Sequence, residues 1–205
     1  MKKIKGVHAK TQNPHLNLYE LEAVNKKGRQ FPYYLASRGK KTEELKLNTR
    51  KNSPDGVVIF SVKKGKTDAE DQVVLVRQYR YTIDNYIYEL PAGLVEKGED
   101  YHLAAVREMK EETGLALHPL SVDPGYERPF FTSVGMTDES CAAVYGWVTG
   151  EISSRFQEDS EEIEVVLADR SEAARILREE NAAIMCAYHL MHFLHDEKVF
   201  AFLKA

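Results

Sequence analysis

The chain has 205 residues, 43% hydrophobic and 29% charged, with 12 glycines and 7 prolines, a composition typical of a folded globular protein with a sizeable core. Its formal net charge of −4 and the lack of a concentrated basic run argue against nucleic acid as a partner, whereas a small anionic substrate remains compatible. The N-terminal lysines have no apolar run behind them and no stretch is long enough to span a bilayer, so we expect a cytoplasmic protein without a membrane partner.

The first segment with a clear pattern is N-terminal. Two alternating runs, LNLYELEAV and FPYYLAS, flank the polar turn NKKG and predict a β-hairpin between Leu16 and Ser37. A charged stretch follows and ends in the turn sequence SPDG. We therefore predict a small N-terminal β extension over residues 1–52 and a main domain over residues 53–205.

The main domain alternates strand and helix patterns. Short β-branched runs predict strands over residues 57–62, 72–79, 86–90, 142–148 and 163–168. Helical spacing predicts helices from Asp100 to Thr113 with Gly114 as C-terminal cap, from Ser171 to Glu180 with Ser171 as N-terminal cap, and from Asn181 to Asp196. Strands on both sides of a helix, with more helices at the end, favour a mixed sheet packed between helices.

Several conspicuous side chains are predicted to be structural. We place Ile184, Ala187, Leu190, Met191 and Leu194 on one apolar stripe of the last helix. The histidines 189, 192 and 195 are interpreted as solvated residues beside that stripe, because no carboxylate partner is fixed for a metal. Trp147 is expected in the core, and Cys141 and Cys186 are expected to be buried thiols.

The most informative stretch lies in the first predicted helix. Glu108, Glu111 and Glu112 stand at offsets of zero, three and four, so their carboxylates share one helix face. Like charges at this spacing repel, and a divalent cation would turn the repulsion into attraction, since hard Mg²⁺ prefers carboxylate oxygens. For this helix alone, a solvated acidic face is the more common outcome of such a cluster.

The flanking residues change that balance. They fit the pattern G-x5-E-x7-R-E-U-x-E-E-x-G-U, U being aliphatic, without a mismatch: Gly93, Glu99, Arg107, Glu108, Met109, Glu111, Glu112, Gly114 and Leu115. The segment thus resembles the Nudix hydrolase family. The resemblance implies an α+β fold, the Nudix-type α/β/α sandwich with a mixed sheet, and Mg²⁺ as cofactor with Mn²⁺ as a substitute.

The resemblance also implies roles for the residues of this pattern, Gly93 to Leu115, which we call the box. Glu108 and Glu112 would be the principal metal ligands, and Glu111 a further ligand or a group that orients water. Arg107 would brace a box glutamate by a charge-assisted pair. Glu99 would support the loop or reach the metals.

Other segments resemble the ADP-ribose pyrophosphatase subgroup. The R-Q-Y-R after a strand and the E-L-P-A-G before the box imply that Arg80 contacts a diphosphate oxygen, which suits a planar guanidinium, and that the carbonyl of Ala92 completes a metal shell. The run TSVGMTDES resembles the subgroup loop S-P-G-x-[TS]-[DN]-E, which implies that Glu139 binds the terminal ribose. Met136 of the same loop is included among the substrate-binding residues. Val134 stands where the subgroup commonly has proline, so this loop lacks the rigidity that proline gives.

A further loop glutamate acts on the attacking water in this subgroup. We assign this role to Glu161, with Glu158 and Glu162 as alternatives in the same acidic segment. The resemblance is weakest for adenine recognition. Subgroup members often have an arginine that holds the adenine just before the first central strand, and here Ser53, Pro54 and Asp55 occupy that place. Tyr33 and Tyr34 of the extension would contribute stacking groups to an adenine pocket; the alternative is that they are ordinary strand residues.

The expected reaction is the hydrolysis of a nucleoside diphosphate derivative, with ADP-ribose giving AMP and ribose 5-phosphate. Two alternatives stay open: a nucleotide sugar as substrate, and a catalytically silent ligand-binding module with the same fold. The resemblance of the N-terminal extension also implies a homodimer.

Overall fold

The computed structural model describes residues 3–157, 162–196 and 198–203, which divide into two compact units. The first unit comprises Met1–Asp55 and Pro129–Cys141, and the second comprises Gly56–Arg128 and Ala142–Ala205. The predicted division between residues 52 and 53 stays a prediction about domains. The compact units differ from it because the segment Pro129–Cys141 packs with the N-terminal residues.

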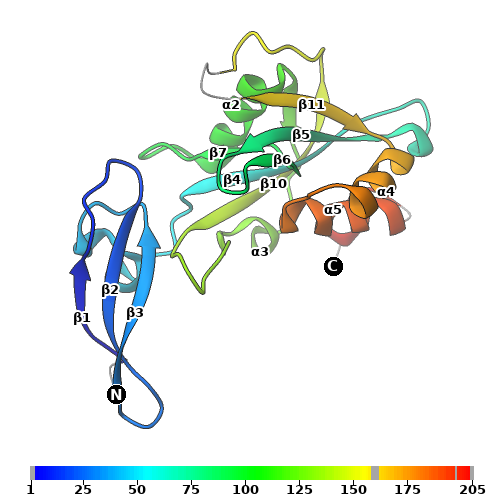
Figure 1. The fold of residues 1–205 in the computed structure, drawn as a ribbon. Helices are drawn as coiled ribbons and strands as arrows, with labels where there is room; N and C mark the ends of the chain where they lie inside the picture. Colours follow the sequence, from blue (N-terminus) through cyan, green and yellow to red (C-terminus); the bar gives the residue numbers. More distant parts are fainter. Residues whose placement is uncertain (1–2, 158–161, 197, 204–205) are drawn as a thin grey trace. The chain divides into compact units, whose positions relative to one another are not determined.

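The first unit is built on a three-stranded antiparallel sheet in the order β1-β2-β3 (Figure 1). The predicted hairpin is confirmed, with Asn17 opposite Ser37 and Val24 opposite Gln30. Gly28 in its turn has φ +81°, a left-handed conformation that suits glycine. The elements of this unit are β1 (Ile4–Ala9), β2 (Asn17–Val24), β3 (Gln30–Ser37), η1 (Thr42–Glu44), α1 (Lys46–Thr49) and β9 (Phe130–Phe131), and β10 (Ser140–Thr149) begins here.

The second unit contains the larger sheet, whose strands follow the order β11-β5-β4-β10-β8, with β6 on β5 and β7 on β4. All five strands predicted for the main domain are present. The elements are β4 (Gly56–Lys63), η2 (Asp68–Glu70), β5 (Gln72–Arg80), β6 (Asn85–Glu89), β7 (Ala92–Leu94), α2 (Tyr101–Thr113), β8 (Ala116–Pro119), α3 (Pro124–Glu127), the rest of β10, β11 (Ile163–Ala168), α4 (Arg170–Glu179), α5 (Ile184–His195) and η3 (Ala201–Leu203).

Apolar side chains from alternate positions of the sheet form two cores. Val57 and Ile59 of β4 pack with Met109 of α2 on one side. Phe60 and Val62 of the same strand pack with the helices α4 and α5, which lie next to each other in Figure 1. Neighbouring residues of a strand point to opposite faces, so one strand serves both cores. The predicted α/β/α sandwich is therefore confirmed.

The helix ends follow local capping chemistry. The predicted first helix is confirmed as α2: the Asp100 side chain accepts hydrogen bonds from the backbone N–H groups of the first turn, and Gly114 ends the helix with φ +77°. The cap predicted for α4 is wrong. Asp169 rather than Ser171 caps this helix, because its carboxylate accepts the Glu172 N–H at 2.8 Å.

The rotation of α5 also differs from the prediction. Its buried residues are Cys186, His189, Leu190 and Phe193, whereas Ile184 and Met191 of the predicted stripe are 81% and 51% exposed. His189 is therefore not solvated; its ring lies 4.9 Å from that of Phe60, and burial lowers its pKa. Cys186 is buried as expected, but Cys141 is only partly buried.

Among the described residues, no helix combines the length and the apolar character needed to cross a membrane.

Candidate active site

The box is a strand, a loop and a helix that are held against the sheet. β7 pairs with β4, with Val57 opposite Gly93 and Val58 opposite Ala92. The helix α2 follows and buries Ala105 and Met109 against the sheet. The position of each carboxylate is therefore set by the packing of α2 and the register of β7.

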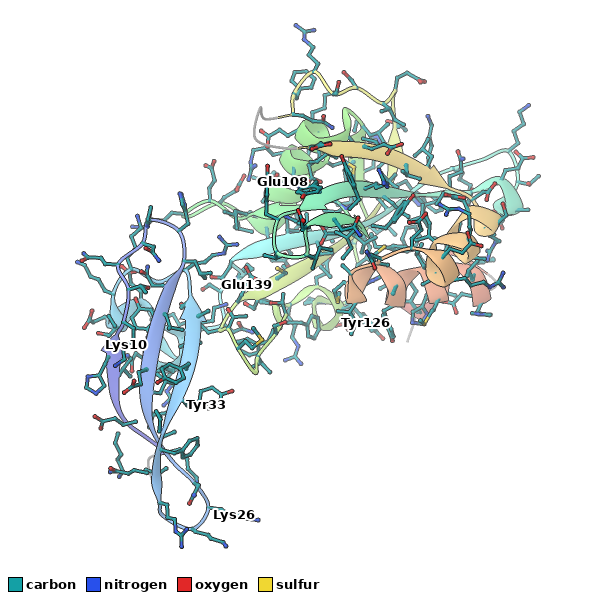
Figure 2. The ribbon with its side chains drawn as sticks, viewed as in Figure 1. Lys10, Lys26, Tyr33, Glu108, Tyr126 and Glu139 are labelled. Carbon is teal, nitrogen blue, oxygen red and sulfur yellow. The ribbon has the colours of Figure 1, made fainter. Side chains whose placement is uncertain are left out.

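Glu108 extends from α2 to the backbone of β7 (Figure 2). A Cβ added to Gly93 would lie 1.9 Å from the Cδ atom of Glu108, far inside van der Waals contact. The carboxylate of Glu108 therefore occupies the space that a side chain at position 93 would fill. Glycine at this position is a steric requirement of the carboxylate, since Gly93 has no positive φ.

Glu112 is the most deeply buried of the three helix carboxylates, with 4% of the residue exposed. Its Oε2 accepts a hydrogen bond from the Ala92 N–H at 3.2 Å. The structure thus brings Glu112 to the residue whose carbonyl is predicted to complete a metal shell.

Arg107 connects the remaining carboxylates. Its Nε and Nη2 donate to Glu99 at 3.1 and 3.0 Å, and its Nη1 donates to Glu108 at 2.8 Å and to Glu111 at 3.0 Å. Nη2 also donates to the carbonyl of Leu94 at 3.0 Å, which ties the guanidinium to β7. These hydrogen bonds, that of Glu99 first, raise the pKa of Arg107, and the same pair lowers the pKa of Glu99.

The chemistry of this donor set fits a hard divalent cation. Carboxylate oxygens of Glu108, Glu111 and Glu112 and the nearby carbonyl of Ala92 are ligands that Mg²⁺ and Mn²⁺ prefer. The space left by the missing side chain of Gly93 holds the carboxylate of Glu108. Arg107 hydrogen-bonds to Glu108 and Glu111 and so keeps these two carboxylates close together. Within residues 3–157, 162–196 and 198–203, however, no group of three or more acidic, histidine or cysteine side chains is already spaced as a metal site.

Arg80 lies at the end of β5, with 46% of its side chain exposed. Its guanidinium forms an ion pair with Glu89 of β6 at 2.7 Å. Sequence reasoning missed Glu89 as a partner. Its signal was the first letter of E-L-P-A-G, but only the register of the two strands shows that the side chains meet.

The other predicted residues have different outcomes. Glu161 and its alternative Glu158 lie outside the described residues; Glu162 accepts a hydrogen bond from the Tyr86 hydroxyl. Glu139 belongs to the first unit, where it pairs with Arg38 at 3.1 Å, and Met136 of the same unit is 72% exposed. The roles of these residues stay predictions.

A cavity of about 380 Å³ is present in the second unit, but it lies away from the box. Its lining comes from the segment between β4 and β5, from β10 and from the C-terminal segment, with Lys64, Trp147 and Phe200 among its residues. We place the candidate site at the box and not in this cavity, because the carboxylates and guanidinium groups that can handle an anhydride are at the box.

The fold and the site together define an α/β/α protein whose strand-loop-helix unit gathers carboxylates for a divalent cation. The profile of the NUDIX domain family matches residues 54–188, and the chain therefore belongs to this family.

Three known proteins show the range of similarity. The chain is 34% identical to an ADP-ribose pyrophosphatase of Saccharomyces cerevisiae over 113 residues, 53% of this chain and 49% of that protein. It is 44% identical to an ADP-sugar pyrophosphatase of Mus musculus over 73 residues, 35% of this chain and 33% of that protein. A crystal structure of an ADP compounds hydrolase shares the fold with a TM-score of 0.58 at 16% identity, covering 86% of this chain and 82% of the other. The chain thus spans about half the length of the yeast relative and a third of the mouse relative.

Proposed function

We propose that this chain hydrolyses the pyrophosphate bond of a nucleoside diphosphate joined to a second group, and that its substrate is ADP-ribose, with AMP and ribose 5-phosphate as products. The observation that carries the proposal is the arrangement of three carboxylates beside β7: Glu108 and Glu111 are held by Arg107, and Glu112 is held by the Ala92 N–H. The names of the yeast and mouse relatives support a substrate of the ADP-ribose type.

The residues that would hold the cation are Glu108, Glu112 and Glu111, with the carbonyl of Ala92. Members of the family generally need a divalent metal, and we propose Mg²⁺, with Mn²⁺ as a substitute. When bound, such an ion lowers the pKa of a coordinated water and neutralises charge on phosphoryl oxygens. Arg107 keeps two of the carboxylates in place through its hydrogen bonds.

The remaining roles follow the resemblance. Arg80 would bind a diphosphate oxygen, which its half-exposed guanidinium can reach, and Glu139 and Met136 would bind the part of the substrate beyond the diphosphate. Glu161 would accept the proton of the attacking water. Alanine at position 161 would then lower kcat more than it raises KM.

A nucleotide sugar is the alternative substrate, and the mouse ADP-sugar relative supports it. Both kinds of substrate present the same diphosphate to Arg80 and differ in the groups attached to it. The second alternative is a ligand-binding module without catalytic activity. The complete set of box carboxylates argues against it.

One assay separates these functions. Purified protein is incubated with ADP-ribose or with a panel of nucleotide sugars, with and without Mg²⁺, and phosphate release is measured through a coupled phosphatase. We expect release from ADP-ribose only with the metal, and its loss in Glu112→Gln with an unchanged melting temperature. Activity in Glu112→Gln close to that of the wild type would refute the metal assignment, and no release from any substrate would favour the silent module.

We also propose a homodimer formed through the first unit. Phe31, Tyr33 and Tyr34 of β3 are 42%, 40% and 51% exposed, an unusual concentration of aromatic surface on one strand (Figure 2 labels Tyr33). Sedimentation of the wild type and of Phe31→Ser would test this. The cytoplasm remains our proposal for the compartment, since both cysteines are free thiols.

A further inference from the structure

The guanidinium of Arg80 is held in a defined orientation by Glu89. Its Nε donates to Oε2 of Glu89 at 2.7 Å, and its Nη2 lies 2.7 Å from the same oxygen. The side chain of Glu89 is 19% exposed, less than half the exposed fraction of its partner. A half-buried carboxylate therefore fixes one edge of a more exposed guanidinium.

The strand register shows how far this contact reaches. Arg80 is paired across the hairpin with Asn85, and Glu89 is paired with Val76. The two residues are thus separated by four positions along the strands, roughly 13 Å at the usual rise per residue. The arginine side chain must extend back along the hairpin to meet Glu89 and cannot project freely from the strand end.

This orientation leaves a useful edge of the guanidinium exposed. A guanidinium has five N–H donors, and the contact with Glu89 uses the edge formed by Nε and Nη2. Within the part of the chain that the structure describes, the guanidinium of Arg80 makes no other hydrogen bond or ion pair. With respect to the described residues, the edge formed by Nη1 and Nη2 is therefore open and can bind two oxygens of a phosphate in the fork geometry.

We propose that Glu89 is a positioning residue for substrate: it turns the free edge of Arg80 to the diphosphate. The inference rests on the proposed function. An ion pair whose guanidinium is 46% exposed is screened by water and contributes little to stability, so we do not expect the fold to depend on this pair. Glu89 precedes Ala92 by three residues, so the same short segment that orients Arg80 continues into the strand that carries the predicted metal-shell carbonyl.

The test is a double-mutant cycle between positions 80 and 89. Wild type, Glu89→Ala, Arg80→Ala and the double variant are compared by kcat and KM for ADP-ribose and by equilibrium binding of its non-hydrolysable methylene analogue with Mg²⁺. The variant Glu89→Gln keeps a hydrogen-bond acceptor at the same length. The matched control is Glu164→Gln, which removes the carboxylate that pairs with Arg77 of the same strand at 3.4 Å.

We expect Glu89→Ala to weaken analogue binding and raise KM by about tenfold, in keeping with the loss of a charge-assisted contact, with less than about a threefold change in kcat. Glu89→Gln should restore part of the affinity. In the Arg80→Ala background the same substitution should change binding by less than about twofold, because the group that it orients is absent. Glu164→Gln should behave as wild type.

Two results would overturn the inference. One is unchanged analogue binding in Glu89→Ala; the other is an equal loss in the presence and absence of Arg80, which would indicate a general structural role for Glu89. If the wild type binds and cleaves no diphosphate at all, the proposed function fails first and the positioning role fails with it, so the two failures are distinguishable.

Discussion

Gly93→Ala is the sharpest probe of the site, because the structure gives the size of the perturbation. The added Cβ would lie 1.9 Å from Cδ of Glu108, whereas ordinary contact begins at 3.4 Å. The carboxylate must therefore move by about 1.5 Å. A misplacement of about 1 Å in a catalytic group costs on the order of 100-fold in rate, so we expect kcat/KM to fall by at least about 100-fold.

The stability of the fold should change little in the same variant. The clashing atoms belong to the end of a flexible side chain, and Gly93 does not have a positive φ. Replacing such a glycine by alanine stabilises a chain by about 0.4–1 kcal/mol through the unfolded state, which offsets the repacking of Glu108. The free energy of unfolding should thus change by less than about 1 kcal/mol.

Gly150→Ala in the same unit provides the matched control. Gly150 has φ +95°, and the Ala116 N atom lies 4.0 Å from the added Cβ, so alanine strains the backbone without touching the site. It should lower the free energy of unfolding by about 1 kcal/mol and leave kcat/KM unchanged. Phosphate release measures kcat/KM, thermal denaturation measures the free energy of unfolding, and Mn²⁺ titration measures the affinity of the site for metal. Normal activity and normal Mn²⁺ affinity in Gly93→Ala would refute the claim that glycine is needed at position 93 to make room for Glu108.

Three further predictions concern the supports of the site and the fold. Arg107→Met leaves the box carboxylates without their shared donor, so its melting temperature should fall more in EDTA than in Mg²⁺; equal losses would contradict the bracing role. Asp100→Ala removes the cap of α2 and should cost about 1 kcal/mol, or about 2–4 °C in melting temperature. Burial lowers the pKa of His189, so the unfolded chain binds the proton more readily and stability should fall as the pH drops below 6.5. His189→Phe should flatten the slope of melting temperature against pH, and an unchanged slope would exclude His189 as its cause.

Much of the fold could be predicted because its signals are local. The five strands of the main domain and α2 show alternation, helical spacing or caps within their own residues. The strands β7 and β8 were missed because three or four residues are too few for a pattern. The burial of His189 was missed because the rotation of α5 depends on the sheet against which it packs.

In the candidate site, too, the features set by local geometry could be predicted and those set by contacts between distant segments could not. The spacing of the box predicted that Glu108 and Glu111 share one helix face, since helical geometry alone fixes that. The spacing did not show that Arg107 would pair with Glu99 as well as with Glu108 and Glu111. The contact with Glu99 depends on the path of the loop between β7 and α2. The pairing of Arg80 with Glu89 likewise depends on strand register. Contacts between distant segments are the part that a pattern of residue types does not contain.

The charges at the box lead to a last prediction about the order of binding. Glu99, Glu108 and Glu111 accept hydrogen bonds from Arg107, and Glu112 accepts one from the Ala92 N–H. These four carboxylates and the guanidinium carry a formal charge of −3 when each carboxylate is ionised. A diphosphate that approaches this cluster without a cation is repelled, and one divalent ion removes two of the three charges. The methylene analogue of ADP-ribose should therefore bind at least about tenfold more tightly in Mg²⁺ than in EDTA, and by linkage Mg²⁺ should bind more tightly to the complex with the analogue. Calorimetric titration in both orders measures this coupling. Equal affinity for the analogue with and without the metal would mean that the substrate is held away from these carboxylates, and the assignment of the box as the reaction site would then be wrong.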